Sequence, residues 1–287
     1  MKLSRDRDSP KFSQTTTTRI RIGRPMSFFS RIADAVVLSP SVDFIDAEDR
    51  AREVVERNGL SFEMWGKYWP ATGRPEHEIA ILKFPGTGGR AERAGPHPID
   101  SWPDVAANVW AVNPPGYGTS GGRATVGVMP MVAEAAWEFI RSRHPNVPIL
   151  VAGNSLGCVS AMYVVARYPA TGLLIRNPPP IHQIIATRAR YNWWNFGAAR
   201  WVAAEIPREL DAVENAKRTN CPAFFVQSVQ DRLVPITYQE MIIDAYAGEK
   251  NVFQIPGADH HDLIPETDQT KYAIELEWLR KRLFAIK

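Results

Sequence analysis

Short apolar runs alternate with longer amphipathic segments along most of the chain. The runs suited to strands are 62–69, 79–84, 108–112, 148–152, 172–175, 223–229 and 252–255. Helical patterns lie between them at 129–143, 156–167, 237–246 and 268–284. Several of the strand runs are apolar at every position, as expected for strands covered by helices on both faces. The alternation predicts a single α/β domain with a mostly parallel sheet over residues 26–287.

Two segments depart from this alternation. Residues 46–58 are rich in charge and predict a surface helix that ends at Gly59. Residues 178–220 mix Pro, Trp and charged residues over a length greater than an ordinary crossover, and we interpret them as a small cap or lid. The cap aromatics either line an acyl pocket or pack the cap onto the domain, with packing the simpler explanation; they are Trp193, Trp194, Phe196 and Trp201.

Charge is distributed unevenly. The chain has 287 residues, 45% of them hydrophobic, and a formal charge of +3, but residues 1–25 alone hold seven Lys or Arg against two Asp. The remainder then carries 27 basic and 29 acidic groups. The basic excess therefore lies in a Ser/Thr-rich arm that we expect to be disordered, and the folded body lacks the basic character of a nucleic-acid-binding protein.

Targeting and redox signals are few. The arm lacks the apolar core of a signal peptide, and no run of 18 apolar residues is long enough for a membrane span, so we expect a cytoplasmic protein. Met26 is an alternative start, and an amphipathic helix at 27–38 that lies on a membrane surface stays open as an alternative. Cys158 and Cys221 lie in apolar contexts and are interpreted as buried thiols.

The sequence GNSLG at 153–157 follows the apolar strand at 148–152 and precedes an apolar helix. A serine turned outward between a strand and a helix needs a strained backbone, and Gly153 and Gly157 leave room for the neighbouring elements. The string alone is weak evidence, but its position between a strand and a helix makes Ser155 a candidate nucleophile.

A serine nucleophile needs a base and an acid that orients the base. Asp231 follows the strand at 223–229, and GADHHDL follows the strand at 252–255. The predicted acid is Asp231, and the predicted base is His260, with His261 as the alternative. Asp262 is interpreted as an anchor of that loop.

Residues from about 60 to 287 resemble the α/β-hydrolase superfamily, and within it the serine hydrolases with a short cap. The matching segments in chain order are FPGTGG (84–89), NPPGYGTSGG (113–122), GNSLG, QDRLVP and GADHHDL. The resemblance implies an α/β-hydrolase fold, the order Ser, Asp, His, and an oxyanion hole made by the backbone amides of Thr87 and Leu156. Pro85 replaces the usual His of the oxyanion loop, and Asn113 replaces a frequent Asp; Pro85 leaves the shape of that loop in question.

Other interpretations are weaker. Gly116, Gly118 and Gly121 spell GxGxxG, but no helix opens within the motif as a dinucleotide-binding turn requires. GADHHDL lacks the ligand spacing of a metal site. The remaining histidines have no acid partner that the sequence places, and we expect ordinary surface residues; they are His77, His97, His144 and His182.

The resulting hypothesis is a serine hydrolase that acts on carboxylic esters or related acyl compounds, with Ser155, His260 and Asp231 as nucleophile, base and orienting acid. No cofactor or metal is expected, and the expected partner is a small acyl substrate rather than nucleic acid. Acyl transfer or peptide cleavage on the same residues, and a binding protein without turnover, remain alternatives. The oligomeric state is left open.

Overall fold

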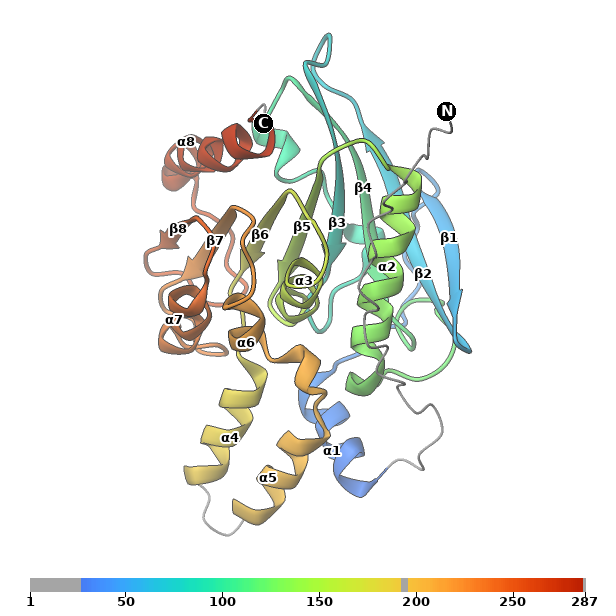
Figure 1. Cartoon of the computed structure of the whole chain (residues 1–287), viewed down its shortest axis with the longest axis vertical. Coiled ribbons are helices and arrows are strands. Elements are labelled where there is room, and N and C mark those ends of the chain that lie inside the picture. Colours follow the sequence, from blue (N-terminus) through green and yellow to red (C-terminus); the bar gives the residue numbers. More distant parts are fainter. Residues whose placement is uncertain (1–26, 192–195, 286–287) are drawn as a thin grey trace, which may run out of the picture.

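The computed structural model describes residues 27–191 and 196–285. An eight-stranded sheet runs through them in the order β1-β2-β4-β3-β5-β6-β7-β8 (Figure 1). The strands are β1 (Ala51–Arg57), β2 (Leu60–Trp69), β3 (His77–Phe84), β4 (Val105–Asn113), β5 (Ile149–Asn154), β6 (Gly172–Arg176), β7 (Ala223–Ser228) and β8 (Lys250–Ile255). The first two pairings in this order, β1 with β2 and β2 with β4, are antiparallel, and all later ones are parallel. The predicted fold class and all seven predicted strands are confirmed.

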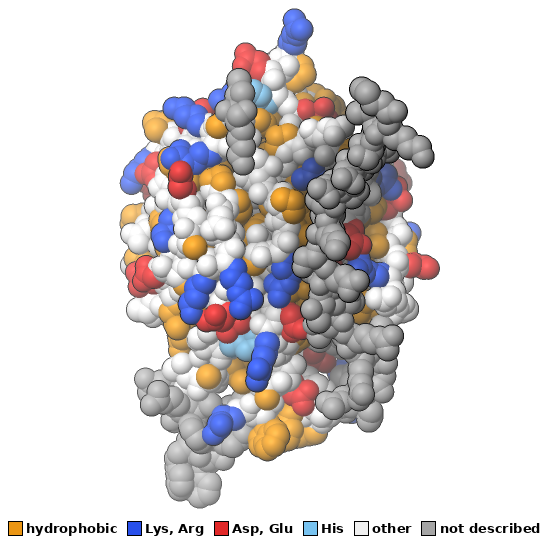
Figure 2. Space-filling view, in the orientation of Figure 1, with side chains coloured by type: hydrophobic (Ala, Val, Ile, Leu, Met, Phe, Trp, Pro, Cys, Tyr) orange, Lys and Arg blue, Asp and Glu red, His pale blue; other side chains and the backbone are white. Residues whose placement is uncertain are grey.

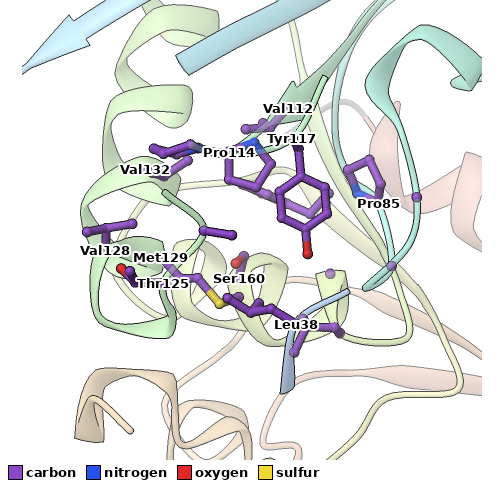
Figure 3. A pocket seen from close by; sticks show the side chains of 17 residues that line it. Leu38, Pro85, Val112, Pro114, Tyr117, Thr125, Val128, Met129, Val132 and Ser160 are labelled. Carbon is purple, nitrogen blue, oxygen red and sulfur yellow. The ribbon is translucent and has the colours of Figure 1, made fainter. Parts of the chain in front are cut away.

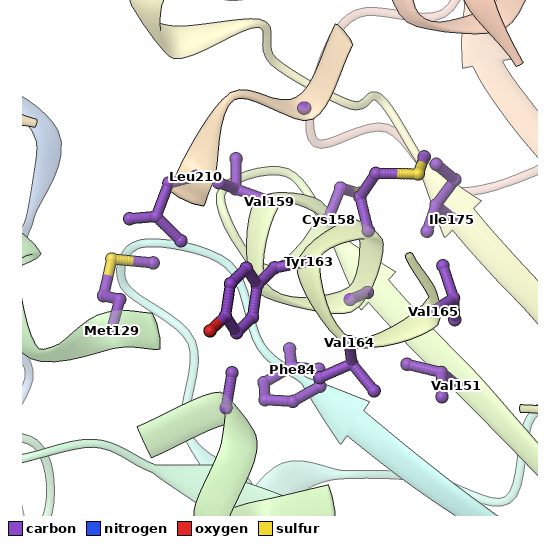
Figure 4. Packing of buried hydrophobic residues seen from close by; sticks show 14 of the residues in the cluster. Phe84, Met129, Val151, Cys158, Val159, Tyr163, Val164, Val165, Ile175 and Leu210 are labelled. Carbon is purple, nitrogen blue, oxygen red and sulfur yellow. The ribbon is translucent and has the colours of Figure 1, made fainter. Parts of the chain in front are cut away.

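Helices cover both faces of the sheet. On one face lie α2 (Met129–Arg143), α3 (Gly157–Val165), α6 (Ala212–Ala216) and α7 (Ile236–Ala245), and α8 (Glu266–Leu283) covers the other face (Figure 1). The all-apolar strands supply both cores, because successive side chains of a strand point to opposite faces. In β5, Ile149 and Val151 face the α3 side, while Leu150 and Ala152 face α8. Figure 4 shows the first of these cores around α3.

The predicted helix at 46–58 is wrong. Residues Ala51–Arg57 form β1, an edge strand paired with β2. Asn58 and Gly59 form the connecting turn, with φ angles of 49° and 79°. Two positive φ values are what a two-residue turn between antiparallel strands requires, and Asn-Gly is its strongest sequence signal. The charged side chains that suggested a solvated helix instead protect an exposed sheet edge.

Residues beyond the carboxyl edge of the sheet form α4 (Ile181–Tyr191) and α5 (Phe196–Glu205), which lie beside α1 (Phe28–Val37) (Figure 1). These helices occupy the segment expected to be a cap, a role that stays a prediction. Phe29 of α1 stacks on Trp201 of α5 with ring centroids 6.0 Å apart. Trp201 is 63% exposed, so it packs against α1 rather than in the core of the domain.

The surface is a mixture of charged and apolar side chains, and hydrophobic groups are visible at the end of the molecule where α1, α4 and α5 lie (Figure 2). Phe28 and Phe44 are 73% and 89% exposed. None of the helices in the described part of the chain combines the length and apolarity needed to cross a bilayer. The expected basic arm at 1–25, together with Trp193 and Trp194, lies outside the described residues.

Candidate active site

Ser155 lies in the sharp turn between β5 and α3. Its φ angle is 50°, a left-handed conformation that is strained for a residue with a side chain. A Cβ added to Gly153 would lie 2.7 Å from Cys158 Cα, and one added to Gly157 would lie 1.9 Å from the carbonyl oxygen of Phe84. Both glycines are therefore needed for close backbone contacts, and the turn has the geometry of a nucleophile elbow.

Three residues from distant loops meet at this turn. His260 Nε2 lies 2.8 Å from Ser155 Oγ, and His260 Nδ1 lies 2.6 Å from Asp231 Oδ2. All three residues are buried, with exposed fractions of 8% for Ser155, 6% for His260 and 4% for Asp231. The carboxylate fixes the proton on Nδ1 and leaves Nε2 as the acceptor for the serine hydroxyl. The structure thus brings together the three side chains that the sequence singled out.

The Asp231 carboxylate is held by further donors that the sequence did not reveal. Its Oδ1 accepts the backbone amides of Leu233 at 2.9 Å and Val234 at 2.7 Å. Its Oδ2 also accepts Gln239 Nε2 at 3.2 Å, in addition to His260. Four donors on one buried carboxylate satisfy both of its oxygens and fix its orientation. Gln239 lies on α7, so only the packing of that helix against β7 brings it to the site.

Asn177 connects the acid side of the site to the base loop. It follows β6 with a φ angle of 50°, and its Nδ2 donates to the carbonyl of His260 at 3.0 Å and to Ser228 Oγ at 3.1 Å. Its Oδ1 accepts the amide of Ser228 at 2.8 Å. A side chain that is both donor and acceptor ties the ends of three strands together. In the sequence, the signal for this role is weak: it is an Asn directly after a strand, a residue type that tolerates the left-handed conformation found here.

The two adjacent histidines have different environments. His260 is buried between Ser155 and Asp231, whereas His261 is exposed and meets the His260 ring edge-on at 4.8 Å. Asp259 accepts the backbone amides of His260 and Arg232, and these bonds lower the pKa of its carboxyl to about 2. Asp262 Oδ2 accepts the amide of Asp259 at 2.8 Å. The acids therefore shape the loop, as predicted for Asp262, and the geometry selects His260.

The backbone amides of Thr87 and Leu156 are the expected oxyanion donors. Among the described residues, neither amide donates a hydrogen bond. Leu156 precedes α3, so its amide lies at the positive end of that helix. The Thr87 hydroxyl donates to the carbonyl of Val37 at 2.8 Å, and the Tyr117 hydroxyl donates to the carbonyl of Thr87 at 2.8 Å. These two bonds anchor the loop of residues 85–89.

Both departures from the family pattern have a structural reason. Pro85 packs against Gly89, where an added Cβ would lie 2.7 Å from Pro85 Cβ, and the loop closes with a bond of 2.9 Å from Gly89 N to Gly86 O. Asn113 is fully buried and its Nδ2 donates to Glu92 at 2.8 Å and to Glu63 at 3.2 Å. An aspartate at this position would keep the amide of Ala91 as a donor to Oδ1, but it would lose both bonds donated by Nδ2 and turn a third carboxylate toward the other two. Arg52 and Arg90 pair with the two glutamates, and the amide supplies one further donor to each.

The remaining motifs have other roles. Gly116 and Gly118 have φ angles of 81° and 60° in the turn after β4, so the GxGxxG string serves a tight turn. Within the described residues, Glu76, His77 and Asp104 form the single cluster with the spacing of metal ligands. Asp104 already pairs with Arg280 there. The buried Cys158 thiol donates to a backbone carbonyl, and its pKa is raised by burial, as expected for an inert thiol.

The expectation of ordinary surface histidines is wrong for His97. Its Nδ1 lies 3.2 Å from Asp100 Oδ1 and its Nε2 lies 2.9 Å from the Tyr272 hydroxyl. Asp100 lies three residues further along the chain, and Tyr272 comes from α8. His77 stacks on Phe284 with ring centroids 4.2 Å apart. Both histidines thus hold α8 against the sheet.

Two cavities flank the loop of residues 85–89, which carries Thr87 and is called the oxyanion loop below. The smaller, of about 50 Å³, is apolar and lies on the α2 and α3 side; Leu38, Tyr117, Val128 and Met129 line it (Figure 3). The larger, of about 870 Å³, lies on the α8 side and is lined by apolar residues together with several charged ones and Asn154. Pro85, Gly86 and Gly89 border both cavities, so the loop is their common wall.

The sheet order and the arrangement of the loops are those of the α/β-hydrolase fold, and the comparisons with known proteins agree with it. The chain is 19% identical over 161 residues to human alpha/beta hydrolase domain-containing protein 17B. The aligned segment covers 55% of this chain and 52% of that protein. The chain thus spans about half the length of the curated relatives it matches. No family model matches the chain.

Solved structures show the same fold. A Pyrococcus furiosus esterase superposes with a TM-score of 0.58 at 17% identity, over 85% of this chain and 97% of that chain. An acetyl xylan esterase from Paenibacillus sp. R4 gives a TM-score of 0.58 at 14% identity, over 88% of this chain and 91% of that chain. At these identities the likeness establishes the fold, and the chemistry has to be argued from the site.

Proposed function

We propose that the chain is a serine hydrolase that cleaves carboxylic esters of short acyl groups through an acyl-enzyme. The observation that carries the proposal is the continuous line of hydrogen bonds from Ser155 through His260 to Asp231. The names of the esterases with the same fold agree with it.

Ser155 Oγ attacks the acyl carbon while His260 Nε2 takes its proton. The imidazolium then gives that proton to the leaving alcohol, and the acyl group stays on Ser155. Water repeats the sequence with His260 as base and releases the acid. Asp231 keeps the imidazole in the required tautomer and stabilises its charged form; the four donors on its carboxylate support this role because they fix its orientation toward His260.

The oxyanion that forms in both steps needs donors aimed at it. The amides of Thr87 and Leu156 support this role because they have no acceptor among the described residues. Each such donor contributes about 3 to 4 kcal/mol to transition-state stabilisation. The anchored loop at 85–89 costs little reorganisation during the reaction, since Thr87 is already held by Val37 and Tyr117.

The size of the apolar cavity supports a short acyl group. It measures about 50 Å³ and borders Gly86 and Leu156 at the oxyanion donors. An apolar cavity of about 150 Å³ accommodates benzene. A cavity a third of that size suits about two carbon atoms, as in acetyl or propionyl esters.

Acyl transfer and peptide cleavage use the same residues, and a binding protein would keep the fold without turnover. Hydrolysis of p-nitrophenyl esters from acetyl to long-chain acyl separates these functions. We expect turnover that is highest for the shortest chains and a loss of at least about a thousandfold in kcat for Ser155→Ala. Ser142→Ala, an exposed serine on α2, is the matched control. Absence of turnover by the native chain on every ester would overturn the proposal.

A further inference from the structure

The large cleft on the α8 side has a marked excess of positive charge. Lys83, Arg93 and Arg176 line it, and among the described residues none of the three forms a salt bridge. The carboxylate that lines the same cleft, Asp100, lies 3.2 Å from His97 Nδ1 and forms no ion pair with Lys83, Arg93 or Arg176 among the described residues. Arg90 also borders the cleft, but Glu92 neutralises it. The cleft thus contains three cationic side chains, and among the described residues no carboxylate lies within ion-pair distance of any of them.

Lys83 is held in this cleft without an anionic partner. Its Nζ donates to the carbonyls of Gly95 at 2.8 Å and His97 at 2.6 Å. Burial lowers the pKa of its ammonium group to about 8, while the charge of Asp100 acts in the opposite direction. An ammonium group removed from water and bonded to carbonyls alone is costly, and an anion in the cleft would offset that cost.

Arg176 connects the cleft to the catalytic loops. Its carbonyl accepts the amide of Ser155 at 2.9 Å, and its guanidinium donates to the carbonyl of Asp262 in the base loop. Its Nε is buried and has no partner among the described residues. The carboxylates of Asp262 and Asp231 act on its charge from beyond ion-pair distance. A buried donor without an acceptor is a group that a ligand can satisfy.

The cleft extends to the residue that precedes Ser155. Gly153 and Asn154, which directly precede Ser155, line it together with Pro85 and Gly86 of the oxyanion loop. The apolar cavity lies across the same loop and is too small for more than a short acyl chain. An ester bound with its carbonyl oxygen at the oxyanion donors has two arms, and these two cavities differ in size and in charged lining as an acyl arm and a charged alcohol arm would.

We propose that this cleft binds the alcohol part of the ester and selects alcohols that carry an anionic group, a carboxylate or a phosphate monoester, through Lys83, Arg93 and Arg176. The inference rests on the proposed function and adds its substrate class. The volume of about 870 Å³ accommodates an alcohol far larger than the acyl group. Charge-assisted bonds to a guanidinium and an ammonium group give such recognition both affinity and orientation.

Matched esters test the proposal. The probes are para-carboxyphenyl acetate, its neutral isostere para-carbamoylphenyl acetate, and para-phosphonooxyphenyl acetate. The measured quantity is the ratio of kcat/KM for each anionic ester to that for the neutral ester, so intrinsic reactivity cancels between variants. We expect Arg176→Met and Lys83→Met each to lower this ratio about tenfold, and Arg93→Ala to lower it less because its side chain is exposed.

Lys217→Ala is the control, because this substitution also removes one positive charge but at an exposed position on the α6 side, away from the cleft. Whichever anionic ester shows the larger drop identifies the anion. Equal ratios in the native chain and all three cleft variants would overturn the inference while the proposed hydrolysis stands. If no ester is hydrolysed, the proposed function fails, and calorimetry with para-hydroxybenzoate tests the cleft alone: binding weakened by Lys83→Met supports the anion site, and no binding refutes it.

Discussion

The cavities on the two sides of the oxyanion loop differ in size, in the charge of their lining residues and in the elements that supply them. On the α2 and α3 side, apolar side chains enclose about 50 Å³. On the α8 side, cations from β3, η1 (Ala91–Arg93) and β6 line about 870 Å³. Pro85 and Gly86 belong to both walls. Under the proposed function, the small cavity would limit the size of the acyl group and the large cleft would select the alcohol by its charge.

The largest effect is expected from substitution of His260, because hydrolysis of every ester depends on this residue in the proposed function. His260→Ala should lower kcat for every ester by about a thousandfold or more, because no other imidazole contacts Ser155. His261→Ala should keep most of the activity, since that ring is exposed and touches His260 only at its edge. Steady-state kinetics on anionic and neutral esters checks both variants. The reverse order would move the base by one residue.

The second-largest effect concerns the stability of the fold at Asn113, the last residue of β4. Asn113→Asp should lower the free energy of unfolding by about 2 to 4 kcal/mol, because a third carboxylate would face Glu63 and Glu92 in a buried site. Denaturant unfolding at neutral pH gives the value, and Asn108→Asp on the same strand is the control, since Asn108 is a partly exposed partner of Glu78. Equal loss for both variants would contradict the role given to the Asn113 amide.

A substitution in the small apolar cavity should change acyl-chain preference without changing the preference for anionic alcohols. Met129→Ala enlarges the small cavity, and we expect the preference for butyryl over acetyl esters to rise about tenfold. The ratio of anionic to neutral alcohols should stay as in the native chain. The two ratios, measured on one preparation whose melting temperature is also recorded, distinguish a local change from general loosening. A parallel shift in both would show that the cavities do not act separately.

The smallest effect is a pH dependence of the cationic side. The folded-state pKa of Lys83 is about 8, below its ordinary value of 10.5, so its charge is lost as pH rises through 8. The groups that act on it are Asp100, which raises its pKa, and Arg50, which lowers it, with His97 offering only its carbonyl. The preference for anionic esters should therefore fall several-fold between pH 7 and pH 9. Lys83→Met should show a flat ratio over the same range.

The sequence was informative where local geometry restricts the residue type. Gly153, Ser155 and Gly157 could be interpreted because a strand-to-helix turn with a positive φ and close backbone contacts admits few alternatives. The strands β2 to β8 were predictable from short apolar runs, several of which, such as that of β5, are apolar on both faces. The hairpin of β1 was missed because its alternating charges fit a surface helix equally well, although the Asn-Gly turn at residues 58 and 59 was a usable signal.

Contacts between loops far apart in the sequence were beyond prediction. Asn177 meets Ser228 and the carbonyl of His260 only because β6 and β7 are neighbours and the loop after β8 folds back over them. Gln239 reaches Asp231 through the packing of α7. The cavities depend on side chains from many elements, so their size and charge appear only once the sheet order is known.

The central claim is that Ser155 is an activated nucleophile, and covalent labelling tests it most directly. The native chain and Ser155→Ala are treated with a fluorophosphonate probe, digested, and mapped by peptide mass spectrometry. The account predicts one modified peptide that contains GNSLG with the adduct on Ser155, slower labelling of His260→Ala, and no adduct in Ser155→Ala. An unlabelled native chain, or a label on another serine such as Ser160, would contradict it.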